Sequence, residues 1–300
     1  MMLKIMNNYW KFLILPILFI LVGVVILATS GFETDIDFSG GTMMQIDMER
    51  ALSIEDQEQI ESTIESVTGV EVYSVQKVGG DSQIIIKMGS IDADKRIEVF
   101  ETLKEKYALA AEQPLASENI SPQISQEIIY NALLAVVIAS VLMMIYIAIR
   151  FELLSGIAAI SAVVFDVLIM LSAYAVFRIP VNASFIAAIL TIIGYSVNDT
   201  IIIFDRIREN LRFSKKEDFA KVCEKSIWQS LRRTLNTTST TAIALIVLFV
   251  FGTESIREFA LPLIIGVISG AFSTIFIASP MWNLMRKDKN AVKGKKVKTA

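Results

Sequence analysis

The stretch IAAILTIIGYSVNDTIIIFDRIREN, residues 186–210, places a carboxylate inside a run of residues apolar enough to cross a lipid bilayer. Asn198 and Asp199 lie within this run, which continues to Phe204. A charged side chain at the centre of a bilayer costs about 3 kcal/mol or more, and such side chains usually face protein and take part in transport. The stretch therefore predicts a membrane span in which Asp199 has a function or a structural partner.

The composition of the whole chain is that of a membrane protein. Its 300 residues are 54% hydrophobic, and the mean hydropathy is +0.57. A membrane-spanning helix needs about 20 apolar residues, and six such runs occur, at 12–29, 129–149, 153–177, 183–205, 232–252 and 260–284. The first run could be a signal peptide, but it is longer than the usual apolar core of about 7–15 residues, so we interpret it as an uncleaved anchor. The sequence predicts a polytopic α-helical membrane protein with six transmembrane helices.

Lysine and arginine predict the orientation of the chain, because cytoplasmic loops are enriched in both. With six spans the two termini lie on one side, and that side receives 19 of the 28 basic residues, mainly in the loop 206–231 and the tail 286–300. The segment 31–127 carries 7 basic and 20 acidic residues. We expect both termini in the cytoplasm and an extracytoplasmic domain at 31–127. We interpret the basic tail as a lipid-facing anchor rather than a nucleic-acid-binding arm.

Residues 42–108 alternate between strand and helix patterns. Strands are predicted at 42–48, 70–78 and 82–88, and helices at 53–67, with Ser53 as N-cap, and at 92–107. The hairpin turn falls on 79–81. The order β-α-β-β-α is typical of a ferredoxin-like α+β domain without its last strand, which could come from 112–121 or be absent.

A helical wheel divides the fourth span into two faces. Small residues favour close helix packing, so we predict that the small and polar face, with Asp199 on it, contacts protein and that the aliphatic face contacts lipid. The small and polar face comprises Ser184, Ala187, Ala188, Thr191, Gly194, Tyr195, Asn198 and Asp199. The aliphatic face comprises Phe185, Ile186, Ile189, Leu190, Ile193, Val197 and Ile201.

Asp199 has a candidate partner in Arg232 or Arg233, which begin the fifth span on the side of the membrane where the fourth span ends. A guanidinium favours an ionised carboxylate, so opening and closing an Arg–Asp pair would move Asp199 between proton-holding and proton-free states. The alternatives are a structural hydrogen bond for Asp199 and ordinary cytoplasmic flanking for the arginines. Asp166, in the third span, is a second intramembrane acid that needs a partner.

Glycines mark two further features. Gly266 and Gly270 form a small-x-x-x-small pattern in the sixth span and, with Gly194 in the fourth, predict helix packing. Gly40 and Gly41 lie in DIDFSGGT, residues 35–42, directly after the first span, where they could form a plain turn.

Several kinds of chemistry are excluded. The chain has no histidine, and its one cysteine, Cys223, lies in the 206–231 loop. Catalysis, metal sites and proton relays that use histidine are therefore ruled out, and so is a disulfide within the exported segment. Because no nucleophile with a base and no phosphate loop stands out either, we expect neither an enzyme nor a bound cofactor or metal.

Four motifs resemble those of the SecF family, the smaller subunits of the SecD–SecF accessory complex of the bacterial Sec protein translocase, within the RND superfamily. They are DFSGG after the first span, GYSVNDTIIIFDRIREN in the fourth, RRTLNTTSTT opening the fifth and ISGAFSTIFIASP in the sixth. The first contains Asp37, Phe38, Gly40 and Gly41. One difference is Phe165 before Asp166, where the family often has histidine.

The resemblance implies that Asp199 is the family's proton-linked aspartate and Arg233 its partner arginine, and we place Asn198 and Asp166 in the same relay. It implies an RND-type half, whose six spans pair with six of a separate SecD about a pseudo-twofold axis. The implied partners are SecD, the SecYEG translocon channel with its associated subunits, exported unfolded polypeptide and membrane lipid, with no nucleic acid. The implied location is the bacterial inner membrane.

The predicted domains are the N-terminus with the first helix (1–30), the extracytoplasmic domain (31–127), a five-helix bundle (128–285) and the tail (286–300). The predicted function is to promote protein export, with SecD, by using the transmembrane gradient of protons or sodium. Two alternatives stay open: an RND-type exporter of lipids or small molecules, and a passive translocase scaffold. In a scaffold, neutral substitutions at Asp199 and Arg233 would be harmless.

Overall fold

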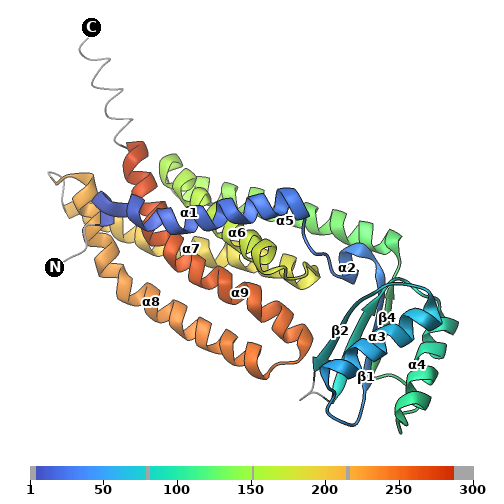
Figure 1. Cartoon of the computed structure of the whole chain (residues 1–300). Coiled ribbons are helices and arrows are strands. Elements are labelled where there is room, and N and C mark those ends of the chain that lie inside the picture. Colours follow the sequence, from blue (N-terminus) through green and yellow to red (C-terminus); the bar gives the residue numbers. More distant parts are fainter. Residues whose placement is uncertain (1–4, 79–81, 151, 214–216, 287–300) are drawn as a thin grey trace. The chain divides into compact units, whose positions relative to one another are not determined.

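The computed structural model describes residues 5–78, 82–150, 152–213 and 217–286. The chain divides into two compact units. One comprises Glu33–Leu134 together with Pro180–Ala183, and the other contains the remaining helical segments. Figure 1 traces the helices and strands of both units.

The first unit contains a four-stranded sheet with two helices. In chain order these elements are β1 (Gly41–Asp47), α3 (Ile54–Thr68), β2 (Val72–Val78), β3 (Gln83–Met88), α4 (Ala93–Tyr107) and β4 (Ala116–Ile120). The strand order is β2-β3-β1-β4, and all neighbouring strands are antiparallel. This arrangement confirms the predicted ferredoxin-like domain, and β4 supplies the last strand that the sequence left open. The predicted hairpin turn at 79–81 lies outside the described residues.

The two helices cover one face of the sheet (Figure 1) and form a core with its inward side chains. In β1, the buried Met44 and Ile46 alternate with half-buried residues, which is the pattern of a strand with one covered face. They belong to one apolar cluster with Ile60 of α3 and Leu103 of α4. The sheet unit therefore has its own hydrophobic core.

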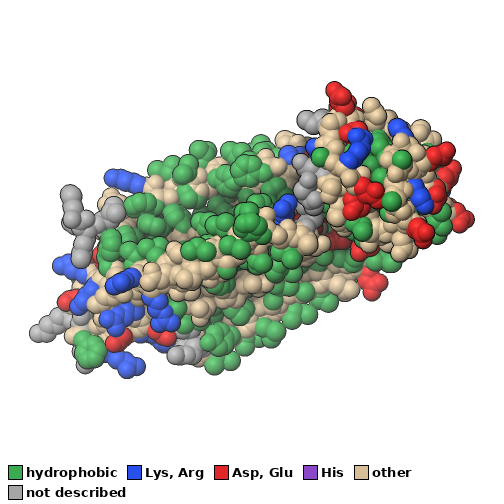
Figure 2. Space-filling view, turned by 90° about the horizontal axis from the view of Figure 1, so that it is seen from below, with side chains coloured by type: hydrophobic (Ala, Val, Ile, Leu, Met, Phe, Trp, Pro, Cys, Tyr) green, Lys and Arg blue, Asp and Glu red, His purple; other side chains and the backbone are tan. Residues whose placement is uncertain are grey.

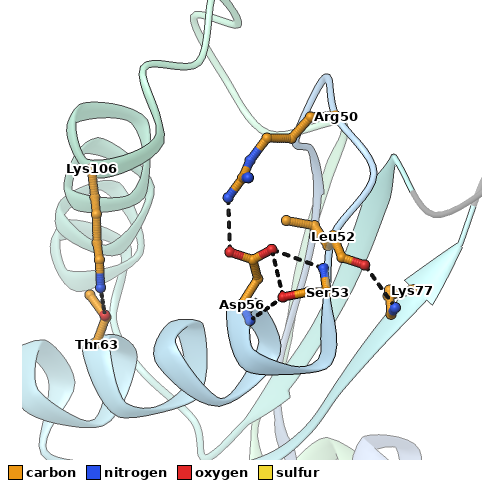
Figure 3. Close-up of polar contacts among 7 residues, drawn as sticks. All are labelled: Arg50, Leu52, Ser53, Asp56, Thr63, Lys77 and Lys106. Carbon is orange, nitrogen blue, oxygen red and sulfur yellow. Dashed lines mark hydrogen bonds and ion pairs between the residues drawn. The ribbon is translucent and has the colours of Figure 1, made fainter.

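Figure 3 shows how α3 begins. The Ser53 hydroxyl accepts a hydrogen bond from the Asp56 N–H at 3.1 Å, and the Asp56 carboxylate accepts one from the Ser53 N–H at 2.9 Å. This reciprocal capping box confirms Ser53 as the N-cap. The backbone hydrogen bond from Ser53, with Arg50 at 2.9 Å as a further contributor, holds the pKa of Asp56 below its usual value.

The second unit is a bundle of long helices. They are α1 (Ile5–Ser30), α6 (Leu153–Phe177), α7 (Ala183–Phe213), α8 (Phe219–Phe251) and α9 (Glu254–Ser273), and α5 (Pro122–Arg150) runs from one unit into the other. Beyond α9 the sixth span continues through a π-helical turn, Thr274–Ala278, to Arg286. Six helices in the described chain are long and apolar enough to cross a membrane, which confirms the predicted number of spans.

The connection predicted at 206–231 differs from a loop, because most of it is helical. α7 continues to Phe213 and α8 already begins at Phe219. In this extension Cys223 is buried in the bundle core, and the Glu224 carboxylate accepts the first two backbone N–H groups of α1 at 3.0 and 2.8 Å. A hydropathy pattern locates only the lipid-facing part of a helix, so it misses such polar extensions. The basic tail from 287 onward lies outside the described residues.

Figure 2 shows where side chains of each kind gather on the visible face. Hydrophobic side chains cover the sides of the bundle, and Lys and Arg gather at the end of the bundle where α7 is followed by α8. Asp and Glu predominate on the surface of the sheet domain. An apolar side surface that ends in a basic rim is typical of a membrane-spanning bundle.

Candidate functional site

Asp199 lies on α7 and is only 1% exposed. Both of its carboxylate oxygens are buried, and neither has a hydrogen-bond partner among the described residues. Burial of a polar group without a partner is unfavourable, and such groups are rare in folded proteins. The arrangement does not fit the alternative interpretation of Asp199 as a structural hydrogen-bonding residue.

Arg233 is the charged residue that acts electrostatically on Asp199. It lies on α8, and its side chain is exposed. No hydrogen bond joins the two residues in the described part of the chain. An arginine that acts on a carboxylate without a hydrogen bond to it is a candidate for a pair that forms and opens.

Two threonines that follow Arg233 also have unsatisfied hydroxyls. The buried Oγ1 atoms of Thr234 and Thr238, one turn apart on α8, have no hydrogen-bond partner within the described ranges. Nearby, the Tyr195 hydroxyl of α7 donates to the Thr241 hydroxyl of α8 at 3.2 Å. In the described chain, four of the buried polar atoms without a partner thus lie on α7 and α8: two on Asp199 and one each on Thr234 and Thr238. These threonines lie in the polar stretch LRRTLNTTST that opens the fifth span, and this stretch is the only local sign of them in the sequence.

Asp166 is fully buried on α6 and, unlike Asp199, is surrounded by donors. It accepts hydrogen bonds from the hydroxyls of Ser196 at 2.6 Å, Ser269 at 2.6 Å and Ser273 at 2.8 Å. The three serines lie on α7 and α9. Asp166 thus connects α6, α7 and α9. Within the described residues, no hydrogen bond joins Asp166 to Asp199. The partner that the sequence requires for Asp166 is this set of serines.

The glycines of the sixth span lie against α7. A Cβ atom at Gly266 would come within 2.4 Å of the Ile192 side chain, and one at Gly270 within 3.4 Å of Ser196 Cβ. α9 therefore approaches α7 closely at these glycines. Ser269 and Ser273, which donate to Asp166, lie on the same face of α9 as the glycines. By contrast, a Cβ at Gly194 would meet nothing within 4 Å.

The predicted faces of α7 need a correction. The aliphatic residues assigned to lipid are largely buried inside this chain, among them Phe185, Ile189, Ile193 and Val197. Much of the small and polar face assigned to protein is exposed instead: Ala187, Thr191, Gly194 and Asn198. The prediction was wrong because a helical wheel does not show which neighbours cover a face: the bundle of this chain covers the aliphatic side and, of the small and polar face, Ala188 and Asp199. Asn198 therefore points away from the buried site of Asp199.

The motif after α1 forms a compact corner. Asp35 caps the short helix α2 (Ile36–Ser39), and Gly40 and Gly41 turn the chain directly from α2 into β1. Their φ angles are +76° and +152°, and a Cβ at Gly41 would lie 2.5 Å from the Met88 carbonyl oxygen, so side chains are disfavoured there. The glycines thus form a turn.

The other two motif residues, Asp37 and Phe38, precede this turn. Phe38 is half-buried. The Asp37 carboxylate accepts a hydrogen bond from the backbone N–H of Ala183 at 2.8 Å. Asp37 therefore has a long-range contact that an ordinary turn does not need.

No group of three or more acidic, cysteine or histidine side chains that could hold a metal occurs in the described residues. The described bundle buries Asp199 without hydrogen-bond donors and Asp166 with three hydroxyl donors, and Arg233 is exposed on α8.

Comparison with known proteins adds relatives that match nearly the whole chain. The family described as "Protein export membrane protein SecD/SecF, C-terminal" matches residues 99–288. A protein translocase subunit SecF from Alicyclobacillus acidocaldarius is 37% identical over 281 residues, which cover 91% of this chain and 90% of that protein. A SecDF from Bacillus subtilis is 36% identical over 265 residues, which cover 87% of this chain and 35% of that protein.

A solved structure of a SecDF protein has the same fold as this chain. The crystal structure of SecDF from Thermus thermophilus, titled a translocon-associated membrane protein, superposes with a TM-score of 0.81 at 30% sequence identity. The match covers 94% of this chain and 38% of that chain, so the present chain corresponds to one part of a longer, fused protein. On the matched family, the identity to full-length SecF proteins and the shared fold, the chain belongs to the SecD/SecF family of protein export membrane proteins, as a SecF-type member.

Proposed function

We propose that the chain is an accessory subunit of the Sec protein translocase that, together with SecD, couples ion movement at Asp199 to protein export. The observation that carries the proposal is a buried carboxylate without a hydrogen-bond partner in the described chain, with an arginine acting on it from the next helix. The relatives' name, protein translocase subunit, supports the role in export. The proposal assigns no catalytic step to the chain.

The physical basis is the difference between a paired and an unpaired carboxylate in a medium of low polarity. An unpaired, ionised Asp199 is costly at this depth, so the unpaired form holds a proton or a cation. Arg233 stays charged, and its approach stabilises the ionised carboxylate. Approach of Arg233 therefore releases the ion and withdrawal allows it to bind again. If the two states open to opposite sides of the membrane, the ion moves in one direction.

SecD is the partner that completes the proposed site. In SecDF relatives the matched part is joined to a second part within one chain. The present chain leaves the small and polar side of α7 exposed, and small residues allow close helix packing in membranes. We propose that SecD covers this exposed side of α7, next to the already buried Asp199.

The proposed location is the bacterial inner membrane, with both termini in the cytoplasm and the sheet domain outside. The basic rim where α7 is followed by α8 (Figure 2) supports a cytoplasmic position for that end of the bundle. The acidic surface of the sheet domain fits an exported position, since positive residues are the ones retained inside.

Protein export into inverted membrane vesicles tests the proposal. Vesicles containing SecD and the chain are compared with and without an uncoupler or sodium ionophore. Asp199→Asn keeps the size of the side chain but cannot titrate, so we expect normal assembly with SecD and loss of the gradient-dependent stimulation. Arg233→Lys keeps the charge but loses the planar guanidinium, so we expect a partial defect. Glu209→Gln, the same chemical change at an exposed site on α7, is the control and should behave like the unsubstituted chain.

Each outcome separates the proposal from its alternatives. Full gradient-dependent stimulation in Asp199→Asn vesicles would show that Asp199 carries no ion and would favour a passive scaffold. Loss of stimulation in Glu209→Gln vesicles as well would show that the assay responds to any loss of charge on α7. Loss of stimulation in Asp199→Asn vesicles, together with normal stimulation in Glu209→Gln vesicles, supports the proposal.

A further inference from the structure

The turn between α6 and α7 belongs to the same compact unit as the exported sheet domain. Pro180–Ala183 forms one unit with Glu33–Leu134, whereas the helices on either side of the turn belong to the bundle. Ala183 is the first residue of α7. The helix that carries Asp199 therefore begins inside the exported unit.

Main-chain hydrogen bonds join this turn to the segment that follows α1. The Val181 N–H donates to the Glu33 carbonyl at 2.8 Å, and the Asp35 N–H donates to the Val181 carbonyl at 3.0 Å. Thr34 and Val181 form a parallel β-bridge. The two segments are thus paired as a short piece of sheet, although they lie about 150 residues apart in the sequence.

Asp37 adds a bond to the helix itself. Its carboxylate accepts the backbone N–H of Ala183 at 2.8 Å. The first four N–H groups of a helix lack partners within the helix, and the helix dipole favours a negative charge at this end. Asp37 therefore caps α7 from a distant segment, and Asp199 lies 16 residues further along the same helix, about 24 Å at 1.5 Å per residue.

Asp35 fixes the same segment to the sheet. One carboxylate oxygen caps α2 through the Ile36 N–H at 2.8 Å, and the other pairs with the Lys87 ammonium at 2.6 Å. Asp35 and Lys87 are each only 7% exposed. Lys87 lies on β3, which is hydrogen-bonded on both sides. Removal of one partner of a buried ion pair strongly destabilises a protein, so this pair holds the segment against the sheet.

We propose that Glu33–Asp37 is a coupling segment, which transmits movement of the exported domain to the start of α7, and that Asp37 is its positioning residue. The continuous path runs from Lys87 through Asp35 and Asp37 to Ala183. This proposal rests on the proposed function, because it names the residues through which the Asp199 helix and the exported domain act on each other.

The test uses the full chain assembled with SecD in vesicles and compares Asp37→Ala with Asp37→Asn. Alanine removes the cap, whereas asparagine keeps an acceptor oxygen in the same place. Hydrogen exchange of the peptide covering 181–190 reports on the cap directly. Since loss of an N-cap changes a local opening equilibrium about five-fold, we expect about five-fold faster exchange there in Asp37→Ala and nearly normal exchange in Asp37→Asn. Gradient-stimulated export is measured on the same vesicles, and we expect it to fall several-fold in Asp37→Ala and to be restored in Asp37→Asn.

The matched control is Asp92→Ala. Asp92 caps α4 in the same unit through the Lys95 N–H at 2.8 Å and is exposed. Its loss frays a helix of the exported domain without touching the coupling segment, so export stimulation should stay normal. If Asp37→Ala does not accumulate, Asp37→Glu takes its place. It keeps the charge and displaces the carboxylate by one methylene, and it should give an intermediate loss of stimulation.

The outcomes are distinct. Full stimulation in Asp37→Ala despite faster exchange at 181–190, while Asp199→Asn abolishes stimulation, would overturn the coupling segment and leave the proposed function intact. Unchanged hydrogen exchange at 181–190 in Asp37→Ala would also overturn the coupling segment, because Asp37 would then not stabilise the start of α7. An equal export defect in Asp92→Ala would show that the defect of Asp37→Ala reflects general damage to the domain, and would also overturn the proposal. Full stimulation in Asp199→Asn would instead contradict the proposed function itself.

Discussion

Two carboxylates are buried in the helical bundle, and they differ in the donors around them. Asp166 accepts three hydroxyl hydrogen bonds, whereas Asp199 accepts none from the residues that the structure describes. Hydrogen bonds to a charged group are roughly twice as strong as those between neutral groups. Asp166 therefore holds helices of the bundle together, and we propose that Asp199 is the carboxylate that changes its charge state during ion movement.

This difference predicts opposite effects of the same substitution. Asp166→Asn replaces one acceptor oxygen by an amide donor that faces serine hydroxyls, and leaving buried partners unsatisfied costs about 1–3 kcal/mol. Asp199→Asn breaks no hydrogen bond in the described chain, so its stability should be nearly unchanged. Ser273→Ala removes one of the three donors and should be intermediate. Thermal unfolding in detergent gives the order, and a larger loss for Asp199→Asn than for Asp166→Asn would contradict the assignment.

The start of α3 predicts a pH dependence of stability in the sheet domain. The pKa of Asp56 is held below its ordinary value of 3.8, mainly by the backbone hydrogen bond from Ser53 (Figure 3). A carboxylate whose pKa is lower in the folded state stabilises that state above its unfolded pKa and loses this contribution as the pH falls through the folded pKa. Asp56→Asn should therefore accelerate hydrogen exchange in α3 at neutral pH. The difference from the unsubstituted chain, compared at matched chemical exchange rates, should shrink below pH 3.8. A difference that stays constant down to acid pH would contradict this account of the cap.

At the scale of elements, hydropathy and periodicity predict what depends on local sequence. The six spans, the ferredoxin-like order and the Ser53 cap all have local signals, and the structure has each of them. The faces of α7 could not be predicted in the same way, because a wheel shows that two faces differ but not which neighbours cover them. The serine partners of Asp166 lie 30 to 107 positions away, and no local pattern connects residues at such separations.

The exposed side of α7 and its buried contact with α9 predict different effects for two glycines. Gly266→Ala should destabilise the isolated chain by about 1–3 kcal/mol, a typical cost of overpacking, because its Cβ would overlap the Ile192 side chain. Gly194→Leu adds a larger side chain where a Cβ meets nothing within 4 Å. It should leave the isolated chain stable but reduce its co-purification with SecD. Equal thermal stability and equal complex yield for both variants would contradict the proposed SecD-facing side.

At the scale of the whole molecule, the chain consists of a sheet unit with its own core and a helical bundle, which we propose is one part of a larger assembly with SecD. The short segments 33–37 and 180–183 are far apart in the sequence, yet they belong to one unit. The motif DIDFSGGT marked one of them, but its Asp37 contact could not be predicted, since the partner is a main-chain N–H of a distant turn. Fused SecDF relatives match this chain over only 35–38% of their length, which leaves room for the unit that would complete the site.

The proposed orientation predicts the labelling of two exposed positions in a Cys223→Ala background. Asp94→Cys lies on α4 of the exported domain, and Lys225→Cys lies on the extension of α8. An impermeant thiol reagent should label the first on intact cells and the second only after the membrane is opened. Reversed labelling would overturn the orientation inferred from the basic residues.

Ion movement through the assembled complex tests the central claim most directly. The chain and SecD are reconstituted into sealed vesicles that contain a dye for protons or for sodium, and ion entry is followed after a gradient is imposed. We expect entry of one of the two ions with the unsubstituted chain and with Glu209→Gln, and none above background with Asp199→Asn in equally well assembled complexes. Entry at the full rate with Asp199→Asn would show that the ion passes without this carboxylate and would contradict the account.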